Sequence, residues 1–588
     1  MRALLFSLLL SSAAAQQWPY YGGDAGGMKY SPLRQIHTRN VSRLQVAWTY
    51  HTGDMSDGKT GKTRSAFEAT PLMIGDRLYV TTPMNRLIAL DAATGREIWA
   101  FDPKLDRTRT YSLYINRGAA WWTDGRQKRL LFGTLDGRLF SVDAESGRPQ
   151  WSINLRAGMA DKFPTRAYGL TSPPAVYGDL VIAGSLASDG EPQGPNGDVR
   201  AFHIATGELA WRFHVIPRAG EFGHDTWQSG STADRGGVNA WAPLSVDHER
   251  GLVFVPLTSP ATDRYGGDRK GDNLFGNSLV ALNARTGKRV WHFQTIHHDL
   301  WDYDLPAQPN LVMLKGRPYV AQITKTGLVF VFDRLTGKPY FPIEERPVAA
   351  SEIEGEWTSP TQPFPVRPPP FARNRFSPDE LRAGSPFCQE VARQAVSGGP
   401  YTPIGAKATI VFPGTNGGAN WGGASFDPRS QTLYVNSMDV GMIVSMVSRP
   451  NQLPRTRGVG TIDSRFWDEQ MHPCQKPPWG HLTAINLKTG KFRWRVPFGN
   501  AQTGSPNIGG SIVTAGGLVF IGAANDAKFR AFDSSNGREL WQIALPSSAF
   551  ATPMTYQTKG RQYVVVAAGG GNDYSSTVSD SLVGYRLP

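Results

Sequence analysis

The phrase that decides the fold is ALDAATGREIW, which runs from Ala89 to Trp99. An alternating strand ends at an aspartate that can bond the turn backbone, and a glycine then supplies a positive φ. A second strand follows and ends in tryptophan, and the pattern returns along the chain. Its copies are SVDAESGRPQW at 141–151, AFHIATGELAW at 201–211, ALNARTGKRVW at 281–291, the variant VFDRLTGKPY at 331–340, and two more at 484–494 and 531–541.

The spacing of these copies predicts a β-propeller. The turn glycines of the first five copies are separated by 52, 60, 80 and 50 residues. Repeats of roughly 40 to 50 residues that each form a small antiparallel sheet are typical of propeller blades. Repetition alone gives seven to nine blades, one of them containing SFDPRSQTLY at 425–434. We expect Trp48 and the last strand, 581–587, to close one blade together, which removes the free sheet edges.

The composition agrees with many short strands joined by turns. The 588 residues include 64 Gly and 43 Pro, and 19% are charged, against roughly 25% in ordinary domains. A hydrophobic content of 40% with 17 Trp argues against disorder, and the turn-rich composition excludes a helical bundle. The net charge of +13 comes from dispersed lysines and arginines, so no nucleic-acid partner is expected.

The N-terminus predicts export. Met1-Arg2, an apolar stretch at 3–10 and small residues at 11–15 are typical of a cleaved signal peptide spanning 1–15. No apolar segment approaches the roughly 20 residues of a membrane-spanning helix, so we expect a soluble periplasmic protein. Residues 16–588 are then a single propeller domain, in which the Pro-rich region around 345–400 is an insertion.

Cys388 and Cys474 are the only cysteines. In an oxidising compartment they are expected to form one disulfide. The absence of Cys-x-x-Cys-His excludes a covalently attached c-type haem.

The repeats, together with four short motifs, resemble the quinoprotein dehydrogenases. The motifs are Gly22-Gly23-Asp24, Asn116-Arg117-Gly118, GEFG at 220–223 and HHDLWD at 297–302. The resemblance covers essentially the whole mature chain. It implies an all-β, eight-bladed propeller of four-stranded antiparallel sheets that holds pyrroloquinoline quinone (PQQ) and a metal ion.

Two further phrases resemble the membrane-bound glucose and quinate dehydrogenase branch. They are SPTQPF at 359–364 and ATPMTY at 551–556. That branch usually carries an N-terminal membrane anchor, whereas only a cleavable signal peptide is expected at this N-terminus. The expectation is a soluble relative whose electron acceptor, a quinone or a separate cytochrome c, stays open.

The resemblance also assigns residues to the cofactor. PQQ is a flat, tricarboxylated ortho-quinone, so its site needs an aromatic platform and cationic clamps. Trp241 matches the stacking tryptophan, Arg117 the clamp on a carboxylate, and Lys325 the lysine at the quinone oxygens, where an ammonium stabilises developing negative charge. Further matched positions are Thr134, Asn420, Trp421 and Asn436.

Carboxylates complete the expected site. Asp302 matches the general base, and Asp189 matches a metal ligand. Strand periodicity would send Asp304 to the same side as Asp302, so that both carboxylates face one ion. Such oxygen ligands favour Ca²⁺, with Mg²⁺ or a lanthanide as alternatives.

The sequence departs from the resembled families at three places. Tyr111-Ser112 stands where alcohol-oxidising members have adjacent cysteines, and Ser259-Pro260 stands where they have a metal-binding asparagine. Leu113 lies near the place of a histidine in glucose-oxidising members, which puts glucose itself in doubt.

These features predict a PQQ-dependent dehydrogenase that oxidises a sugar, polyol or other alcohol. Hydride would pass to PQQ while a metal ion acts as Lewis acid and Asp302 takes the hydroxyl proton. The alternative is a non-catalytic propeller scaffold of the cell envelope, since one fold hosts many functions. A scaffold, however, has no need for Arg117, Trp241, Asp302 and Lys325 together.

Overall fold

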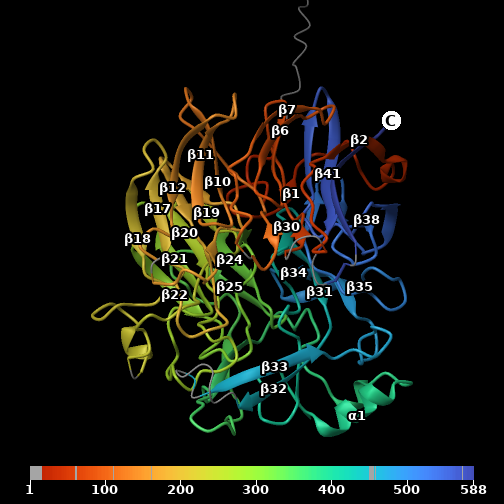
Figure 1. The fold of residues 1–588 in the computed structure, drawn as a ribbon. Coiled ribbons are helices and arrows are strands. Elements are labelled where there is room, and N and C mark those ends of the chain that lie inside the picture. Colours follow the sequence, from red (N-terminus) through yellow and green to blue (C-terminus); the bar gives the residue numbers. More distant parts are fainter. Residues whose placement is uncertain are drawn as a thin grey trace, which may run out of the picture.

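The computed structural model describes residues 16–59, 63–109, 111–159, 162–228, 230–448, 456, 458–571, 574–575 and 577–588. The expected signal peptide, 1–15, lies outside these residues. Within them, nearly all regular structure is β, and eight of the described sheets succeed one another along the chain as blades (Figure 1). The predicted all-β, eight-bladed propeller is confirmed.

The first half of the chain forms four four-stranded antiparallel blades. Two of them are β4 (Leu72–Ile74), β5 (Arg77–Thr81), β6 (Leu87–Asp91) and β7 (Glu97–Phe101), then β9 (Ala120–Thr123), β10 (Lys128–Gly133), β11 (Arg138–Asp143) and β12 (Pro149–Asn154). The next two are β14 (Ala175–Tyr177), β15 (Leu180–Ala183), β17 (Val199–His203) and β18 (Leu209–Phe213), then β19 (Ser245–Asp247), β20 (Leu252–Pro256), β21 (Ser278–Asn283) and β22 (Arg289–Gln294).

The second half is less regular. One blade has three strands, β23 (Asn310–Leu314), β24 (Arg317–Ile323) and β25 (Val329–Asp333). The next is β30 (Ala424–Asp427), β31 (Thr432–Met438), β34 (Gly480–Asn486) and β35 (Lys491–Pro497). A further sheet adds β1 (Tyr30–Ser31) to β36 (Ser511–Thr514), β37 (Leu518–Ile521), β38 (Lys528–Asp533) and β39 (Glu539–Ala544). The inner strands β9, β14, β19, β23, β30 and β36 contact one another in this order.

Both ends of the chain share the eighth blade, as predicted. Its strands are β2 (Gln45–His51), β42 (Val578–Arg586), β41 (Arg561–Gly570) and β40 (Met554–Thr558), in this spatial order. β2 pairs antiparallel with β42, and Trp48 lies opposite Gly584. In Figure 1 the blue β41 and the red β2 accordingly lie in the same part of the molecule, and β42 pairs with both strands.

Between β25 and β30 the chain leaves the ring. This segment contains β26 (Ile343–Pro347), β27 (Thr361–Pro365), η3 (Pro378–Glu380), α1 (Pro386–Gln394), β28 (Val396–Ser397) and β29 (Thr409–Val411). β29 pairs with β32 (Met442–Ser448), which forms a hairpin with β33 (Val459–Arg465) at the lower end in Figure 1. The predicted disulfide between Cys388 in α1 and Cys474 is present.

No helix in the described part of the chain is long and apolar enough to cross a membrane. The remaining short elements are η1 (Val41–Arg43), η2 (His224–Thr226), β3 (Ser65–Ala66), β8 (Tyr114–Ile115), β13 (Tyr168–Gly169) and β16 (Leu186–Ala187).

Neighbouring blades are joined by a contact that the repeat itself encodes. The tryptophan ending one copy packs on the turn glycine of the next, so closely that a Cβ on Gly287 would lie 2.4 Å from the Trp211 ring. Five more pairs do the same: Trp48 with Gly95, Trp99 with Gly147, Trp151 with Gly207, Trp291 with Gly337, and Trp494 with Gly537.

Hydrogen bonds fix these tryptophans as well. The indole N–H of Trp211 donates to the carbonyl oxygen of Ala284 at 3.1 Å, and that of Trp151 donates to Ile204 at 2.8 Å. At the equivalent carbonyl oxygen of Ala92, the donor is instead the hydroxyl of Tyr556, at 2.6 Å. The repeat therefore supplies both a packing contact and a polar contact between blades.

This contact predicts that Gly287→Ala destabilises the protein more than Gly316→Ala. Both glycines have positive φ, +69° and +75°, so both variants carry a backbone cost of about 1–2 kcal/mol. A Cβ on Gly316 meets nothing within 4 Å, whereas one on Gly287 collides with Trp211. We expect an additional loss of about 1–3 kcal/mol in the free energy of unfolding, measured in urea. Equal losses would show that the tryptophan contact carries no weight.

Candidate functional site

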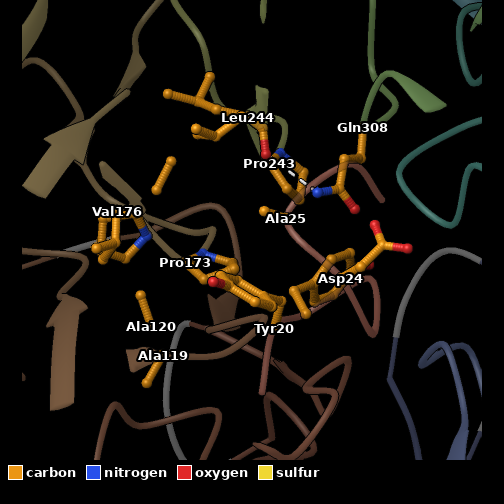
Figure 2. A pocket seen from close by; sticks show the side chains of 14 residues that line it. Tyr20, Asp24, Ala25, Ala119, Ala120, Pro173, Val176, Pro243, Leu244 and Gln308 are labelled. Atoms are coloured by element: carbon orange, nitrogen blue, oxygen red, sulfur yellow. Dashed lines mark hydrogen bonds between the residues drawn. The ribbon is translucent and has the colours of Figure 1, made fainter. Parts of the chain in front are cut away.

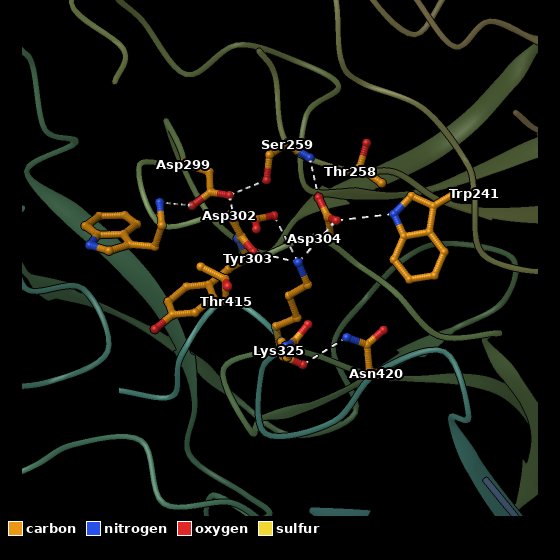
Figure 3. A network of polar contacts seen from close by, with 12 residues as sticks. Trp241, Thr258, Ser259, Asp299, Asp302, Tyr303, Asp304, Lys325, Thr415 and Asn420 are labelled. Atoms are coloured by element: carbon orange, nitrogen blue, oxygen red, sulfur yellow. Dashed lines mark hydrogen bonds and ion pairs between the residues drawn. The ribbon is translucent and has the colours of Figure 1, made fainter. Parts of the chain in front are cut away.

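The centre of the candidate site is the ammonium group of Lys325, in the turn after β24. Its Nζ donates to Oδ1 of Asp302 at 2.9 Å, to the backbone oxygen of Asp302 at 2.7 Å, and to Oδ2 of Asp304 at 3.2 Å (Figure 3). Burial lowers the pKa of Lys325, but attraction to the two carboxylates outweighs it and raises the pKa overall. Lys325 is therefore a permanent cation shared by two carboxylates.

The backbone around Asp302 differs from the expected strand. Residues 299–304 form an irregular loop, and Asp302 has a φ of +61°. Asp299 shapes this loop, because its carboxylate accepts hydrogen bonds from the backbone N–H of Trp301 at 2.9 Å and of Tyr303 at 2.8 Å. Strand alternation was thus the wrong reason for placing Asp302 and Asp304 together, although both do face Lys325.

Asp304 connects the lysine to Trp241. Its Oδ2 accepts a hydrogen bond from Nε1 of Trp241 at 3.2 Å, and its Oδ1 accepts one from the backbone N–H of Ser259 at 2.9 Å. The hydroxyl of Ser259 donates to Asp299. Ser259 therefore supports the site through its backbone and its hydroxyl.

Two more aspartates lie within electrostatic reach of this network. Burial raises the pKa of Asp302 to about 7; Lys325 lowers it, and Asp304 and Asp189 raise it. Burial also raises the pKa of Asp189 to about 6, and repulsion by Asp304 adds to the shift. Asp263 has a pKa raised well above the usual range by burial and by repulsion from the other three aspartates. Sequence reasoning missed Asp263, although it follows the substituted asparagine position by only a few residues.

The four carboxylates fit a hard cation in their chemistry. One oxygen of Asp263 is buried without a hydrogen-bond partner in the described structure. Oxygen donors of this kind suit Ca²⁺, Mg²⁺ or a lanthanide. Among the described residues, however, no three His, Cys, Asp or Glu side chains are gathered closely enough to hold a metal. An ion bound here would take part of its shell from water or from a bound cofactor.

Arg117 lies between two indole rings. Its guanidinium carbon is 5.1 Å from the ring centroid of Trp241 and 5.0 Å from that of Trp421. Its Nε donates to Oε2 of Glu68 at 3.1 Å. Burial raises the pKa of Glu68 to about 7, and Arg117 acts in the opposite direction. No motif had pointed to Glu68, which orients the guanidinium.

The surroundings of Trp241 fit a flat polyanion. Buried donors without a partner among the described residues include Nη1 of Arg117, Nε1 of Trp421, and the hydroxyls of Thr171 and Ser185. Thr171 and Ser185 line a small cavity beside Trp241. Buried polar groups are normally hydrogen-bonded, so these four donors are available to a ligand that carries acceptors. The three carboxylates of PQQ are such acceptors.

The other matched positions are placed unequally. Asn420 adjoins the site, accepting from the backbone N–H of Trp421 at 2.8 Å and donating to the backbone oxygen of Asn416 at 2.9 Å. The hydroxyl of Thr134 donates to the Asp136 carboxylate within the β10–β11 turn. In β31, Asn436 donates to Asn507 at 2.8 Å. The described contacts of Thr134 and Asn436 therefore connect neither residue to Lys325 or Trp241.

A second cavity lies next to the same region and has a different character. Tyr20, Asp24, Pro173, Pro243 and Leu244 are among its mostly apolar lining (Figure 2). Burial raises the pKa of Asp24 to about 6, and backbone N–H groups nearby counteract this. No lysine or arginine lines this cavity, so it does not suit a tricarboxylate.

Comparisons with known proteins find similarity along nearly the whole chain. A family model described as "PQQ: Glucose/ethanol/alcohol dehydrogenase, beta-propeller domain" matches residues 18–564. Quinoprotein glucose dehydrogenase A of Acinetobacter calcoaceticus is 34% identical over 98% of this chain and 80% of its own. The quinate/shikimate dehydrogenase (quinone) of Acinetobacter baylyi is 34% identical over 97% and 78%, respectively.

A solved structure extends the comparison to three dimensions. The quinohemoprotein alcohol dehydrogenase ADHIIG of Pseudomonas putida has a TM-score of 0.76 with this chain at 26% identity. The match covers 97% of this chain and 80% of that one.

The shared cation predicts that Lys325→Met destabilises the fold. The variant leaves Asp302 and Asp304 buried without their common partner, and breaking a buried pair in this way costs about 3–5 kcal/mol. The double variant Lys325→Met/Asp304→Asn should regain part of this loss, because it removes one stranded charge. Urea unfolding of both variants measures the effect. A single variant as stable as the wild type would contradict it.

Proposed function

The chain belongs to the PQQ-dependent glucose/ethanol/alcohol dehydrogenase family and is a dehydrogenase of CH–OH groups. From this premise we propose that it oxidises a sugar, polyol or other alcohol at the Asp302–Lys325 network. The observation that carries the proposal is the position of Lys325 between Asp302 and Asp304, with Asp304 hydrogen-bonded to Trp241. The proton acceptor is thereby tied to the proposed cofactor platform.

In this proposal, Trp241 and Arg117 hold the cofactor. The indole ring of Trp241 offers the stacking face, and Arg117, oriented by Glu68, meets a carboxylate. The unpartnered hydroxyls of Thr171 and Ser185 provide further donors. When bound, PQQ supplies the two-electron acceptor for the hydride of the substrate.

Asp302 acts as the general base. Burial raises the pKa of Asp302 to about 7, which makes its carboxylate basic enough to take the hydroxyl proton. At neutral pH a substantial fraction of this carboxyl group is still ionised. The Lys325 ammonium fixes the carboxylate through Oδ1 and through the backbone oxygen of the same residue. Lys325 also places a positive charge beside the site where negative charge develops.

A metal ion is proposed next to these carboxylates. Asp189, Asp302 and Asp304 are the expected ligands, and water or the bound cofactor would complete the shell, because the described carboxylates are not gathered closely. Ca²⁺ is favoured over Mg²⁺ or a lanthanide. The ion would act as a Lewis acid that polarises the reacting oxygen. Burial is the main cause that raises the pKa of Asp189 and of Asp302, and repulsion from Asp304 adds to both shifts. A bound cation would relieve this repulsion, which supports the proposal.

We further propose a periplasmic location and an external electron acceptor. The signal-like sequence at 1–15 motivates the location. The acceptor is a quinone or a separate cytochrome c, and the name of the quinate/shikimate relative includes a quinone. A non-catalytic scaffold fits less well, because the unpartnered donors around Trp241 have no use in it.

Asp302→Asn is predicted to retain PQQ and to lose turnover. The amide keeps the shape of the carboxylate but does not accept the proton, and loss of a general base typically lowers the rate about 10²- to 10⁴-fold. Bound PQQ is measured by its absorbance, and turnover by reduction of an artificial acceptor with a panel of sugars, polyols and alcohols. Asp225→Asn, at an exposed position in η2, serves as the control. Near-normal turnover of a cofactor-loaded variant would remove Asp302 from the mechanism.

Asp304→Ala is predicted to weaken metal binding. Asp304 either enters the coordination shell or bonds a metal-bound water, and a carboxylate retains lone pairs for this beside its present hydrogen bonds. Calorimetric titration of metal-free protein with Ca²⁺ and La³⁺ compares the variant with the wild type. Unchanged affinity for both ions would show that Asp304 serves only Trp241 and Lys325.

A further inference from the structure

A fully buried arginine lies next to the loops that carry the carboxylates of the candidate site. Arg269 belongs to the segment between β20 and β21, and none of its side chain is exposed. Burial lowers the pKa of its guanidinium, and nearby carboxylates, that of Glu356 foremost, act in the opposite direction. The guanidinium stays charged even so, because it loses its proton only in strong base. The mechanism proposed above gives this buried cation no role.

The guanidinium of Arg269 joins two loops through their backbone. Its Nη2 donates to the backbone oxygen of Asp299 at 2.6 Å and to that of Thr262 at 3.0 Å. Its Nη1 donates to Oδ1 of Asn273 at 2.8 Å, and Nδ2 of Asn273 donates to the backbone oxygen of Arg269 at 2.5 Å. The reciprocal contact with Asn273 fixes the guanidinium, which in turn holds the two carbonyl groups at a defined distance from each other.

The two loops carry aspartates that repel one another. The first loop contains Asp263, directly after one of the carbonyl groups that Arg269 binds. The second contains Asp302 and Asp304 (Figure 3). Burial raises the pKa of Asp263, and repulsion from Asp189, Asp302 and Asp304 adds to the shift. Like charges therefore push the two loops apart, and the hydrogen bonds of Arg269 oppose this.

Arg269 binds the second loop at the residue that determines its shape. The carboxylate of Asp299 accepts hydrogen bonds from the backbone N–H groups of Trp301 and Tyr303 and from Nδ2 of Asn277, the last at 3.0 Å. The backbone oxygen of the same aspartate is the one that Arg269 holds. A shift of Asp299 would therefore move the loop that places the proposed general base.

The insertion after β25 contributes to the same buried cluster. Glu356, between β26 and β27, supplies a carboxylate near Arg269. Its Oε2 accepts a hydrogen bond from the backbone N–H of Gly266 at 2.9 Å, and its Oε1 lies 3.6 Å from Nε2 of the buried His298. Since Arg269 is enclosed by these segments, it contacts neither a substrate nor a cofactor directly. Its influence on the reaction has to pass through the loops that it holds.

We propose that Arg269 is a positioning residue, which clamps the loop of Asp263 to the loop of Asp302 and so fixes the proposed base beside the proposed metal ligands. The proposal rests on the function proposed above and adds a residue to it. Arginine suits this task because its planar guanidinium donates in several fixed directions. A lysine would keep the charge, but its compact ammonium on a flexible stem would not hold both carbonyl oxygens at a defined distance.

Arg269→Lys is predicted to retain PQQ and to lose turnover. A displacement of about 1 Å in a catalytic group can cost about 10²-fold in rate, so we expect kcat to fall about 10- to 100-fold. The KM should stay within about twofold, since Arg269 does not contact the substrate. Both constants are measured in protein loaded with PQQ and Ca²⁺, by reduction of an artificial acceptor with the panel of sugars, polyols and alcohols. An unchanged kcat in an active enzyme would overturn the proposal.

Arg530→Lys is the matched control, because it removes a buried guanidinium from another blade. Arg530 on β38 is 1% exposed and donates to Asp526 at 3.0 Å and to Glu539 at 3.2 Å. Both variants should lose stability in urea unfolding, but only Arg269→Lys should lose kcat under conditions in which both are folded. A kcat that falls equally in the two variants would show that Arg269 serves the fold alone, which contradicts the proposal.

Asn273→Gly tests the same clamp if Arg269→Lys does not fold. This variant removes the side chain that fixes the guanidinium, and glycine readily adopts the φ of +61° found at this position. We expect kcat to fall about 3- to 10-fold, because Arg269 keeps its two carbonyl partners but is held less firmly. A folded, active Asn273→Gly enzyme with the kcat of the wild type would also count against the clamp.

Hydrogen exchange, followed by mass spectrometry, separates this proposal from the one on which it rests. Asp299 holds the backbone N–H groups of Trp301 and Tyr303, so peptides covering 299–304 should exchange about 10-fold faster in Arg269→Lys than in the wild type or in Arg530→Lys. Faster exchange in a protein that oxidises no alcohol supports the clamp and rejects the proposed activity. Unchanged exchange rejects the clamp, whether or not the protein is an active dehydrogenase.

Discussion

The packing of a tryptophan on the glycine of the next repeat is the constraint on which the rest of the structure depends. It sets how far apart successive blades stand, because the glycine leaves room for nothing larger than a hydrogen atom against the ring. The site residues come from many blades: Glu68, Arg117, Trp241, Asp302, Lys325 and Trp421 are distant in sequence. Their separations therefore depend on how far apart successive blades stand.

The second constraint is the balance between the aspartates and the single lysine of the candidate site. Four aspartates are brought close to one lysine, and burial without compensation is costly for each carboxylate. The fold tolerates this because Lys325 is shared and because Asp299 and Ser259 fix the surrounding loop. An arrangement that is unfavourable for stability by itself is typical of a site built to bind charged ligands.

Features that a local pattern or a single possible pairing determines could be predicted from the sequence. The blade phrase, the shared terminal blade and the single disulfide each follow from local patterns or from the only available pairing. Contacts between distant loops could not. Glu68 has no motif, Asp299 acts through backbone N–H groups, and Asp263 reaches the site through a fold that no spacing reveals. Asp302 and Asp304 both contact Lys325, but strand alternation is not the reason, since a positive φ at Asp302 replaces the expected strand.

The pairing of β2 with β42 has a consequence for how the molecule comes into being. The ribosome releases β2 long before β42, so β2 has no pairing partner while the intervening blades form. The circle becomes complete only when the final strand arrives, and a chain cut short near its end leaves an open arc with two exposed sheet edges. Since the C-terminal region also contacts the N-terminal part through a hydrogen bond from Thr70 to Thr552, the arrangement of the blades is completed last. We therefore expect the candidate site to be complete only after β42 has paired with β2.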